Sequence, residues 1–529
     1  MRSPTRPTRA LRVVSVVSLA ALGWVASPSR LEAVGPAGWR VIGTEVVRPD
    51  GRSYRIAGMS WYGFETRLAV AHGLWQKDYR FLVDRIKATG ANTIRIPYSN
   101  QMWETNPRPA RNDVAGCPAC AGLRARDILA LIINYAGAVG LHVILDNHRS
   151  TGGDSAQANG LWYTTSYPER AWIRDWVNVQ RWVHGLPSTL GRADTVPVNF
   201  LASDGFPIVI GYDLRNEPHT PKGAAYTSGA TWGTGDGISP TTNPNPNPFV
   251  PTCVRTSTCK DWRLAAERAA DTLLGDALAR GWDYPIIFVE GVSHYPQATG
   301  TPSNGPYDTY WWGGNLRGIN GNARNPGAPI VLNAGGTAAS LGPPVYGQLV
   351  YSAHDYGPTL YAQHWFNGTT CYMAGCSGTS LAQLWSTFWA HITVSGGVNP
   401  VWPGHGAYPW SSTGHVAYSQ APVWVGEFGT GNQPADLTSS VRGSQGQWFT
   451  AMVNFIQSSW SLAPANNPGV VADRLHWTYW ALNANDSYGV LGPNWSLLGV
   501  ASKVTTFLCA ILPTRGPACS ADPLPSPGP

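Results

Sequence analysis

The sequence is poor in charged residues. Only 13% of its 529 residues are Asp, Glu, Lys or Arg, against roughly 25% in an average soluble domain. Five of them are Lys, and the basic residues form no run. Because disordered chains are rich in charge and poor in aromatics, the 11% aromatic content excludes disorder for the bulk of the chain. The sequence therefore has no basic patch of the kind that binds nucleic acid.

Regular repeats and long apolar runs are also missing. The 59 Gly have no three-residue period, which excludes collagen, and no sustained heptads occur, which excludes a coiled coil. After the N-terminal region, no apolar segment is long enough to cross a membrane. What the chain does have is 43% hydrophobic residues and 25 Trp. A large core is therefore feasible, and the flat indole rings suit stacking on sugars or on other aromatics.

The N-terminus is typical of a secretory signal peptide. Four Arg precede the apolar run 13–26, which is short for a bilayer span. Cleavage could follow Ala26 or Ala33, and an uncleaved anchor is the alternative. We assign residues 1–33 to the signal; their loss would remove five Arg and one Glu and lower the net charge from +6 to +2. We therefore expect a secreted, extracellular protein with no membrane contact after signal removal.

The eight cysteines form four close pairs along the chain. An even number of cysteines behind a signal peptide predicts disulfides. We expect pairing between nearest neighbours, although the Cys-Pro-Ala-Cys segment could instead be a redox motif or half of a zinc site. The pairs are Cys117 and Cys120, Cys253 and Cys259, Cys371 and Cys376, and Cys509 and Cys519.

Short β-rich runs alternate with helical patterns along most of the chain. This alternation predicts parallel strands joined by crossover helices. The expected strands are 56–61, 93–97, 142–146, 208–214, 286–290, 349–354, 423–427 and 475–480. The expected helices are 78–89, 125–139, 169–183, 262–280, 380–394, 445–458 and 501–512.

Eight strand-like runs predict a (β/α)₈ TIM barrel with loop insertions. Gly90, Gly140 and Gly281 come where a helix ends before the next strand, as expected for the left-handed position after a helix. A doubly wound sheet is the alternative, but that fold typically has a Gly-rich phosphate-binding loop after its first strand. Tyr62-Gly63-Phe64-Glu65 stands there instead.

Additional segments surround this barrel pattern. We expect an N-terminal hairpin over 39–58 that turns at Pro49-Asp50-Gly51. Long insertions occupy 186–205, 228–258 and 395–414. The expected organisation is a signal peptide over 1–33, a catalytic barrel over 34–512 and a Pro-rich tail over 513–529.

Polar residues end nearly every expected strand. In a barrel of this kind, functional groups lie at the C-terminal ends of the strands. Glu217 and Glu427 would face each other there across the barrel mouth. Paired carboxylates are what acid/base cleavage of a glycosidic bond requires. The residues at these strand ends are Arg95, Asp146-Asn147-His148, Asn216-Glu217-Pro218, His354-Asp355-Tyr356, Glu427 and Trp480.

Five of these strand-end segments resemble glycoside hydrolase family 5, and most of all its secreted bacterial endoglucanases. The resemblance extends over 58–480 and departs from the family pattern at the long insertions, which leaves the substrate range open. The five segments are Asn92-Thr93-Ile94-Arg95-Ile96-Pro97, Ile144-Leu145-Asp146-Asn147-His148, Leu214-Arg215-Asn216-Glu217-Pro218, Ser352-Ala353-His354-Asp355-Tyr356 and Trp424-Val425-Gly426-Glu427-Phe428-Gly429.

The resemblance implies retaining hydrolysis, with Glu217 as acid/base and Glu427 as nucleophile. The two carboxyl groups should then stand roughly 5–5.5 Å apart. Arg95 and Tyr356 would keep Glu427 ionised, and Asn216 would bind the 2-hydroxyl of the reacting sugar. His354 would orient Glu217, and His148 would contact sugar hydroxyls. Trp480 would form the floor of the site, with further substrate contacts from Trp61, Trp312 and Gln363.

The resemblance implies a monomeric enzyme that cleaves internal β-1,4 bonds of cellulose or a related β-glucan without a metal or organic cofactor. β-Mannan or another β-glycan is the alternative substrate. A barrel that binds carbohydrate without cleaving it is the alternative from another class, and both Glu217 and Glu427 argue against it. A zinc site at His148 and His354 is a further alternative, but the first expected strand offers no His to complete it.

Overall fold

The structure is a computed structural model of the chain. It describes residues 38–225, 228–234, 259–296, 307–321, 327–332, 347–366, 381–398, 420–460, 472–496 and 502–519. The expected signal peptide, most of the insertions 228–258 and 395–414, and residues 520–529 lie outside these ranges, as do Cys253, Cys371 and Cys376.

Eight parallel strands close into a barrel, which confirms the predicted fold class. Closure occurs where the last strand pairs with the first, with Trp477 beside Ala57 and Tyr479 beside Met59. Each of the expected strand runs supplies one barrel strand. The barrel strands are β3 (Ala57–Ser60), β4 (Thr93–Ser99), β5 (His142–Arg149), β6 (Val209–Asp213), β7 (Ile286–Glu290), β10 (Leu349–His354), β11 (Val423–Glu427) and β12 (His476–Tyr479).

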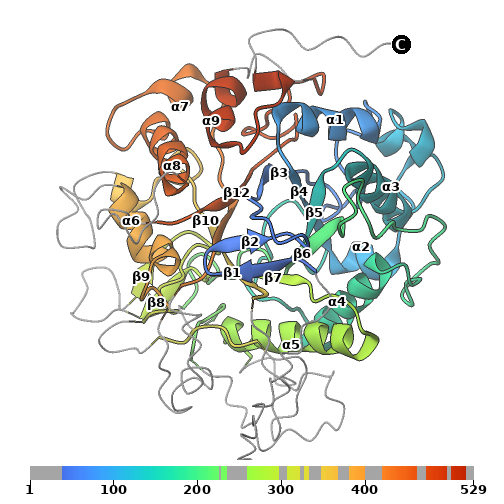
Figure 1. Cartoon of the computed structure of the whole chain (residues 1–529), viewed down its shortest axis with the longest axis horizontal. Helices are drawn as coiled ribbons and strands as arrows, with labels where there is room; N and C mark the ends of the chain where they lie inside the picture. Colours follow the sequence, from blue (N-terminus) through green and yellow to red (C-terminus); the bar gives the residue numbers. More distant parts are fainter. Residues whose placement is uncertain are drawn as a thin grey trace, which may run out of the picture. The chain divides into compact units, whose positions relative to one another are not determined.

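Helices surround the strands, as Figure 1 shows. The predicted crossovers are present, and the short helices α2 and α7 were not foreseen. The last expected helix is a π-helix over Ser502–Leu508 that continues into a short α-helix. The α-helices are α1 (Tyr79–Thr89), α2 (Asn100–Thr105), α3 (Ala125–Ala138), α4 (Glu169–Val183), α5 (Trp262–Arg280), α6 (Leu381–Phe388), α7 (Pro434–Thr438), α8 (Gln445–Ser459) and α9 (Cys509–Ile511).

Local sequence explains where the helices begin and end. The Asp78 side chain caps α1 by accepting from the Arg80 backbone N–H, and the Asp261 side chain caps α5 by accepting from that of Leu264. Gly90 and Gly281 follow these two helices with φ of 95° and 66°. Only Gly adopts such a conformation without strain, so the predicted stop signals are confirmed.

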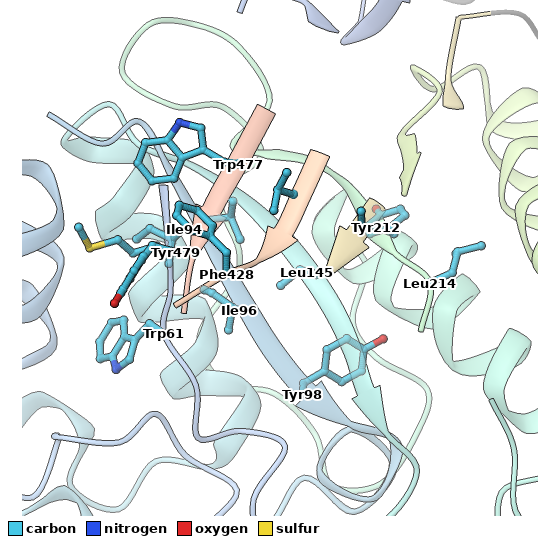
Figure 2. Close-up of a cluster of buried hydrophobic side chains, with 14 of the residues drawn as sticks. Trp61, Ile94, Ile96, Tyr98, Leu145, Tyr212, Leu214, Phe428, Trp477 and Tyr479 are labelled. Carbon is cyan, nitrogen blue, oxygen red and sulfur yellow. The ribbon is translucent and has the colours of Figure 1, made fainter. Parts of the chain in front are cut away.

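The barrel strands separate apolar from polar residues. Along β4, Ile94, Ile96 and Tyr98 belong to the large cluster of apolar side chains that the strands share with the helices (Figure 2). Arg95 alternates with them and faces the opposite side, because successive side chains of a strand point to opposite faces. This alternation places one buried charge inside the barrel between two Ile that pack outside it.

A hairpin covers the N-terminal end of the barrel, and it has one more turn than predicted. Strands β1 (Arg40–Ile42) and β2 (Glu45–Val47) pair directly through a turn at Gly43-Thr44 that was not foreseen. The predicted turn at Pro49-Asp50-Gly51 is present as well, since the Gly51 N–H donates to the Arg48 carbonyl and Val47 pairs antiparallel with Ser53. Both sequences suit tight turns.

The hairpin packs into the open end of the barrel. Its Trp39, Val41 and Val46 share a second buried cluster with inward-facing residues from the strand beginnings. The Trp39 indole N–H donates to the Pro207 carbonyl at 3.1 Å. This apolar plug lies at the opposite end from the strand-end polar residues. The strand residues of the cluster are Ile144, Ile210, Ile286, Phe288, Val350 and Trp424.

Two of the expected disulfides lie in the described residues. Cys117 bonds to Cys120 and Cys509 to Cys519, as nearest-neighbour pairing predicted. The first bond uses both thiols of the Cys-Pro-Ala-Cys segment, so they are not zinc ligands here. A fifth cysteine, Cys259, is also disulfide-bonded.

The predicted start of the Pro-rich tail needs correction. Residues 513–519 pack against the end of α1, where the Gly516 N–H donates to the Thr89 carbonyl. A side chain at Gly90 would collide with the Thr514 carbonyl, at 2.1 Å. Together with the Cys509–Cys519 bond, these contacts make the segment part of the barrel domain.

The insertion 186–205 lies against the outer helices. The buried Arg126 of α3 donates to the carbonyls of Leu190 and Arg192 and pairs with Asp194 at 2.6 Å. This insertion is therefore anchored on the helical ring.

The other described loops add one small sheet. Strands β8 (His294–Pro296) and β9 (Tyr307–Thr309) form an antiparallel pair after β7. None of the helices in the described ranges is both long enough and apolar enough to span a bilayer.

Candidate active site

Arg95 organises a buried charge cluster at the C-terminal end of the barrel. Its side chain is fully buried, and Nη1 donates to Glu427 Oε1 at 2.5 Å. Its other nitrogens donate to Asp213 Oδ2 at 3.0 and 3.1 Å and to Asn216 Oδ1 at 2.9 Å. Asp146 Oδ2 lies 3.1 Å from Nη2. One guanidinium thus links the ends of β4, β5 and β11 with the end of β6 and the loop that follows it.

Folding brings Glu217 and Glu427 together, although 209 residues separate them in the sequence. One oxygen of each lies within 4.8 Å of the other and of the His354 ring nitrogen. This spacing agrees with the roughly 5–5.5 Å of retaining glycosidases and is too short for the 6.5–9.5 Å of inverting ones. The Glu217 side chain keeps 17% of its surface exposed, and that of Glu427 keeps 5%. Glu217 is therefore the more accessible member of the pair.

The two carboxyl groups have opposite pKa shifts. Burial raises the pKa of Glu217 to about 7; the hydrogen bond to His354 opposes this shift, and the charge of Glu427 adds to it. Burial acts on Glu427 too, but His354, Arg95 and the hydrogen bond from Tyr356 hold its pKa at about 2. The Tyr356 hydroxyl donates to Glu427 Oε2 at 2.7 Å. At mildly acidic pH one carboxyl is protonated beside one that is ionised, and this pair can serve as acid and nucleophile.

His354 lies between the two carboxyl groups. Its Nδ1 is 3.1 Å from Glu217 Oε1 and 3.6 Å from Glu427 Oε2. Burial alone would lower the pKa of His354, but the charges of Glu290 and Glu427 raise it well above its usual value. The expected contact of His354 with Glu217 is present.

His148 and Asn216 are also near the pair. His148 Nδ1 hydrogen-bonds Asp146 Oδ2 at 2.7 Å, which fixes the ring, and burial holds its pKa well below the usual value. Because Asn216 Oδ1 already accepts from Arg95, its Nδ2 is the group that could donate to a ligand.

Aromatic rings form one wall of the site. Trp480 stacks on His148 at 5.6 Å between ring centres and on Tyr62 at 5.2 Å. Its Nε1 donates to Asp486 Oδ2 at 3.2 Å, so the indole is held at its edge as well. Trp480 is only partly buried, which leaves surface for a ligand.

A second ring lies beyond Glu217. Trp312 is 38% exposed and stacks on His219 at 3.7 Å between ring centres. His219 is itself hydrogen-bonded to the Glu217 carbonyl. The Trp312 indole therefore packs on a histidine ring that is hydrogen-bonded to the Glu217 backbone. The contact of Trp312 with substrate stays a prediction.

The structure does not place Trp61 where the sequence reasoning expected it. Its side chain is 1% exposed, lies in the apolar cluster of Figure 2, and donates its indole N–H to the His72 carbonyl at 2.9 Å. Trp61 is therefore a core residue, and Tyr62, the next residue, contacts the Trp480 ring instead. The error arose because position along a strand end does not tell which face a side chain takes.

Gln363 is half-buried in the loop after β10, beside Trp365, and its contact with substrate also stays a prediction.

Glu217, His354 and Glu427 are close enough together to be considered as cation ligands. Two observations argue against that use. Both Glu427 oxygens already accept hydrogen bonds, from Arg95 and Tyr356, and the Arg95 charge would repel a cation beside it. Within the residues that the structure describes, His148 does not belong to this group, so His148 and His354 do not come together as in the zinc site considered from the sequence.

Sequence reasoning missed two carboxylates of the charge cluster, Asp213 and Glu290. Asp213 ends β6 and Glu290 ends β7, and both are fully buried. Their position at strand ends is the same signal that identified Glu427, so they could have been found. They were passed over because neither belongs to a segment that resembles the family.

A closed (β/α)₈ barrel with such a carboxyl pair at its C-terminal rim defines a glycoside hydrolase. The comparison with known families gives a narrower assignment. A family model described as cellulase (glycosyl hydrolase family 5) matches residues 51–486, and the chain belongs to this family.

Known relatives cover most of the chain. An endoglucanase from Paenibacillus polymyxa is 32% identical over 456 residues, which cover 86% of this chain and 82% of the relative. The major extracellular endoglucanase from Xanthomonas campestris pv. campestris is 26% identical over 472 residues, 89% of this chain and 70% of that relative.

Solved structures share the fold. The catalytic domain of the Xanthomonas campestris enzyme superposes with a TM-score of 0.58 at 24% identity and covers 90% of this chain and 100% of that one. A cellotetraose complex of an endocellulase from Pyrococcus horikoshii has a TM-score of 0.57 at 25% identity, with coverage of 90% and 99%.

Proposed function

We propose that this protein is a secreted, monomeric endo-β-1,4-glucanase that cleaves internal bonds of cellulose or related β-glucans with retention. The observation that carries the proposal is the pair of carboxyl groups within 4.8 Å, one with a pKa of about 7 and the other of about 2. Family membership and the relatives named endoglucanases support the substrate class. The relative named extracellular and the Arg-rich, apolar N-terminus support secretion.

Glu427 acts as nucleophile in the first step. Its carboxylate attacks the anomeric carbon, while Glu217 gives its proton to the leaving glycosidic oxygen. The bond between sugar and leaving group breaks, and a covalent glycosyl-enzyme forms. Arg95 and Tyr356 keep Glu427 ionised for this attack.

Water completes the reaction. Glu217, now ionised, takes a proton from a water molecule that attacks the anomeric carbon, and Glu427 leaves as a carboxylate. Both residues return to their starting protonation states. His354 orients Glu217 throughout, at 3.1 Å from its carboxyl oxygen.

The remaining residues hold the sugar. Asn216 Nδ2 donates to the 2-hydroxyl, and His148, fixed through Asp146, contacts other hydroxyls. The exposed part of the Trp480 ring supports the apolar face of the reacting sugar. Trp312 and Gln363 contact further sugar units.

The test is release of reducing ends from a soluble cellulose derivative, mannan and xylan, with Glu217→Gln beside the wild type. We expect release from the cellulose derivative that is lost in the variant. Release from mannan alone would keep the mechanism and change the substrate. No release from any polymer by the folded wild type would refute hydrolysis and favour a carbohydrate-binding barrel.

A further inference from the structure

Glu290 contacts both the backbone of Glu217 and the ring of His354. It is the last residue of β7, and its side chain is fully buried, so it cannot touch substrate. Its Oε2 accepts from the Glu217 backbone N–H at 2.7 Å. Its Oε1 lies 3.2 Å from His354 Nε2 and 3.5 Å from Arg95 Nη2. One carboxyl group therefore reaches the acid/base residue and the histidine that orients it.

The Glu217 backbone needs such a support. Its φ of 49° lies in the left-handed region, which a residue with a side chain adopts only under strain. Such strain persists where neighbouring groups fix the backbone. Glu290 fixes it on the N–H side, and His219 Nδ1 lies 2.6 Å from the Glu217 carbonyl on the other.

Gly313 allows Glu290 to lie there. A Cβ at Gly313 would stand 2.2 Å from Glu290 Oε2 and 3.4 Å from Glu217 Cα. The φ of Gly313 is 69°, which also suits glycine. The loop that contains Gly313 thus passes so close to the Glu290 carboxyl that a methyl group at position 313 would displace this carboxyl.

The pKa of Glu290 is raised in spite of the cations beside it. Burial raises this pKa to about 8, and the nearby His354 and Arg95 oppose the shift. Where Glu290 is ionised, its charge raises the pKa of His354 and that of Glu217. The charged or titratable groups that face it are Arg95 of β4, Asp213 of β6, Arg215 and Glu217 after β6, and His354 of β10.

We propose that Glu290 is a positioning residue for hydrolysis, whose two oxygens hold the Glu217 backbone and the His354 ring where Glu217 can deliver its proton. The proposal rests on the proposed role of Glu217 as acid/base. Glu290 acts through these two residues and makes no contact with the sugar.

The test compares Glu290→Gln and Glu290→Ala with the wild type on the soluble cellulose derivative. Because general acid catalysis contributes about 10²–10⁴-fold, we expect kcat to fall about tenfold in Glu290→Gln and about 100-fold in Glu290→Ala, with KM nearly unchanged. Because the pKa of Glu290 is about 8, its carboxyl is largely protonated where Glu217 titrates. The basic limb of the pH–rate profile of Glu290→Gln should therefore keep its position, and the loss should appear in kcat.

Glu267→Gln is the matched control. Glu267 is a largely buried carboxyl, 14% exposed, that accepts a backbone N–H from Val331 at 2.9 Å and pairs with Arg263 at 2.6 Å, but it lies on α5. We expect this variant to lower the Tm and to keep the kcat and pH profile of the wild type. A stability effect is thereby separated from a positioning effect.

Gly313→Ala gives an independent variant that keeps the Glu290 side chain. It should displace the Glu290 carboxyl and lower kcat, and it should cost less in a Glu290→Ala background, where the collision is absent. An unchanged kcat in folded Glu290→Gln, or strict additivity of the two substitutions, would overturn the positioning role. An inactive wild type would instead refute the proposed function, so the two failures are distinguishable.

Discussion

At the scale of single residues, the account depends on Glu427 as nucleophile. Glu427→Ala should lower kcat on the cellulose derivative by about 10⁴-fold or more, because loss of a catalytic nucleophile removes the covalent step. Binding of a cello-oligosaccharide should persist, since Asn216, His148 and Trp480 stay in place. Calorimetry on the folded variant measures this binding. Near-normal turnover in Glu427→Ala would show that another group is the nucleophile.

The pH dependence of kcat/KM follows from the same pair. Glu217 must be protonated, so activity is lost as pH rises through its pKa of about 7. Glu427 must be ionised, so activity is lost only as pH falls toward its pKa of about 2. We expect a basic limb near neutral pH and an acidic limb well below pH 4 in initial-rate measurements. A profile that is flat across neutral pH would contradict the assignment of Glu217.

The sequence identified most of the residues at the site, but it did not reveal what surrounds each of them. Glu217, Glu427, Arg95, His354 and Tyr356 lie together as expected, since strand-end position is a property of the chain. The burial of Trp61 and the contacts of Glu290 depend on which face a side chain takes and on Gly313 of a distant loop. Such contacts between distant segments leave no local pattern.

At the scale of elements, the plug formed by β1 and β2 supports stability and lies away from the chemistry. Trp39 is 2% exposed and has edge contacts with Tyr54 and His142 at 4.8 Å. Trp39→Ala should cost about 3–5 kcal/mol of unfolding free energy, the usual range for a buried Trp. Urea unfolding measures the loss.

The kcat of folded Trp39→Ala at low temperature should equal that of the wild type. The plug packs on strand beginnings, whereas Glu217 and Glu427 lie at the opposite rim. A large loss of kcat in the folded variant would show that the two ends of the barrel are coupled.

The barrel strands were predictable because each is buried on both faces and reads as a short apolar run between turn residues. The turn at Pro49-Asp50-Gly51 was predictable too, whereas the turn at Gly43-Thr44 was not. The short strands β1 and β2 are recognised only by their pairing, with Arg40 opposite Val47. Likewise, the packing of 513–519 on α1 follows from backbone contacts that its Pro-rich composition does not reveal.

At the scale of the whole molecule, many titratable groups are buried, and they fall into two sets with opposite effects. Burial raises the pKa of several carboxyl groups to about 7 or 8 and lowers that of several histidines to about 4 or below. The carboxyl groups are Glu65, Asp146, Asp175, Asp213, Glu217, Glu290 and Asp355. The histidines are His72, His219, His294, His391 and His476.

The two sets oppose each other below neutral pH. A carboxyl with a raised pKa stabilises the fold at low pH, and this contribution is lost as pH rises through the folded value. A histidine with a lowered pKa contributes stability that grows as pH rises to its unfolded value of about 6.5. Above that value stability is lost through the carboxyl groups and through His354, whose pKa is raised, and is opposed by Lys503, whose pKa burial lowers to about 7. The Tm should therefore fall between pH 6.5 and 8 in calorimetric scans, and a Tm that rises over this interval would contradict these shifts.

The central claim is that Glu217 and Glu427 together cleave a β-glucosidic bond with retention. The most direct measurement is the anomeric configuration of the first product, followed by proton NMR while the wild type hydrolyses a cello-oligosaccharide. The account predicts that the β-anomer appears first and then mutarotates, because two displacements at the anomeric carbon restore its configuration. Initial release of the α-anomer would show a single displacement and contradict the account.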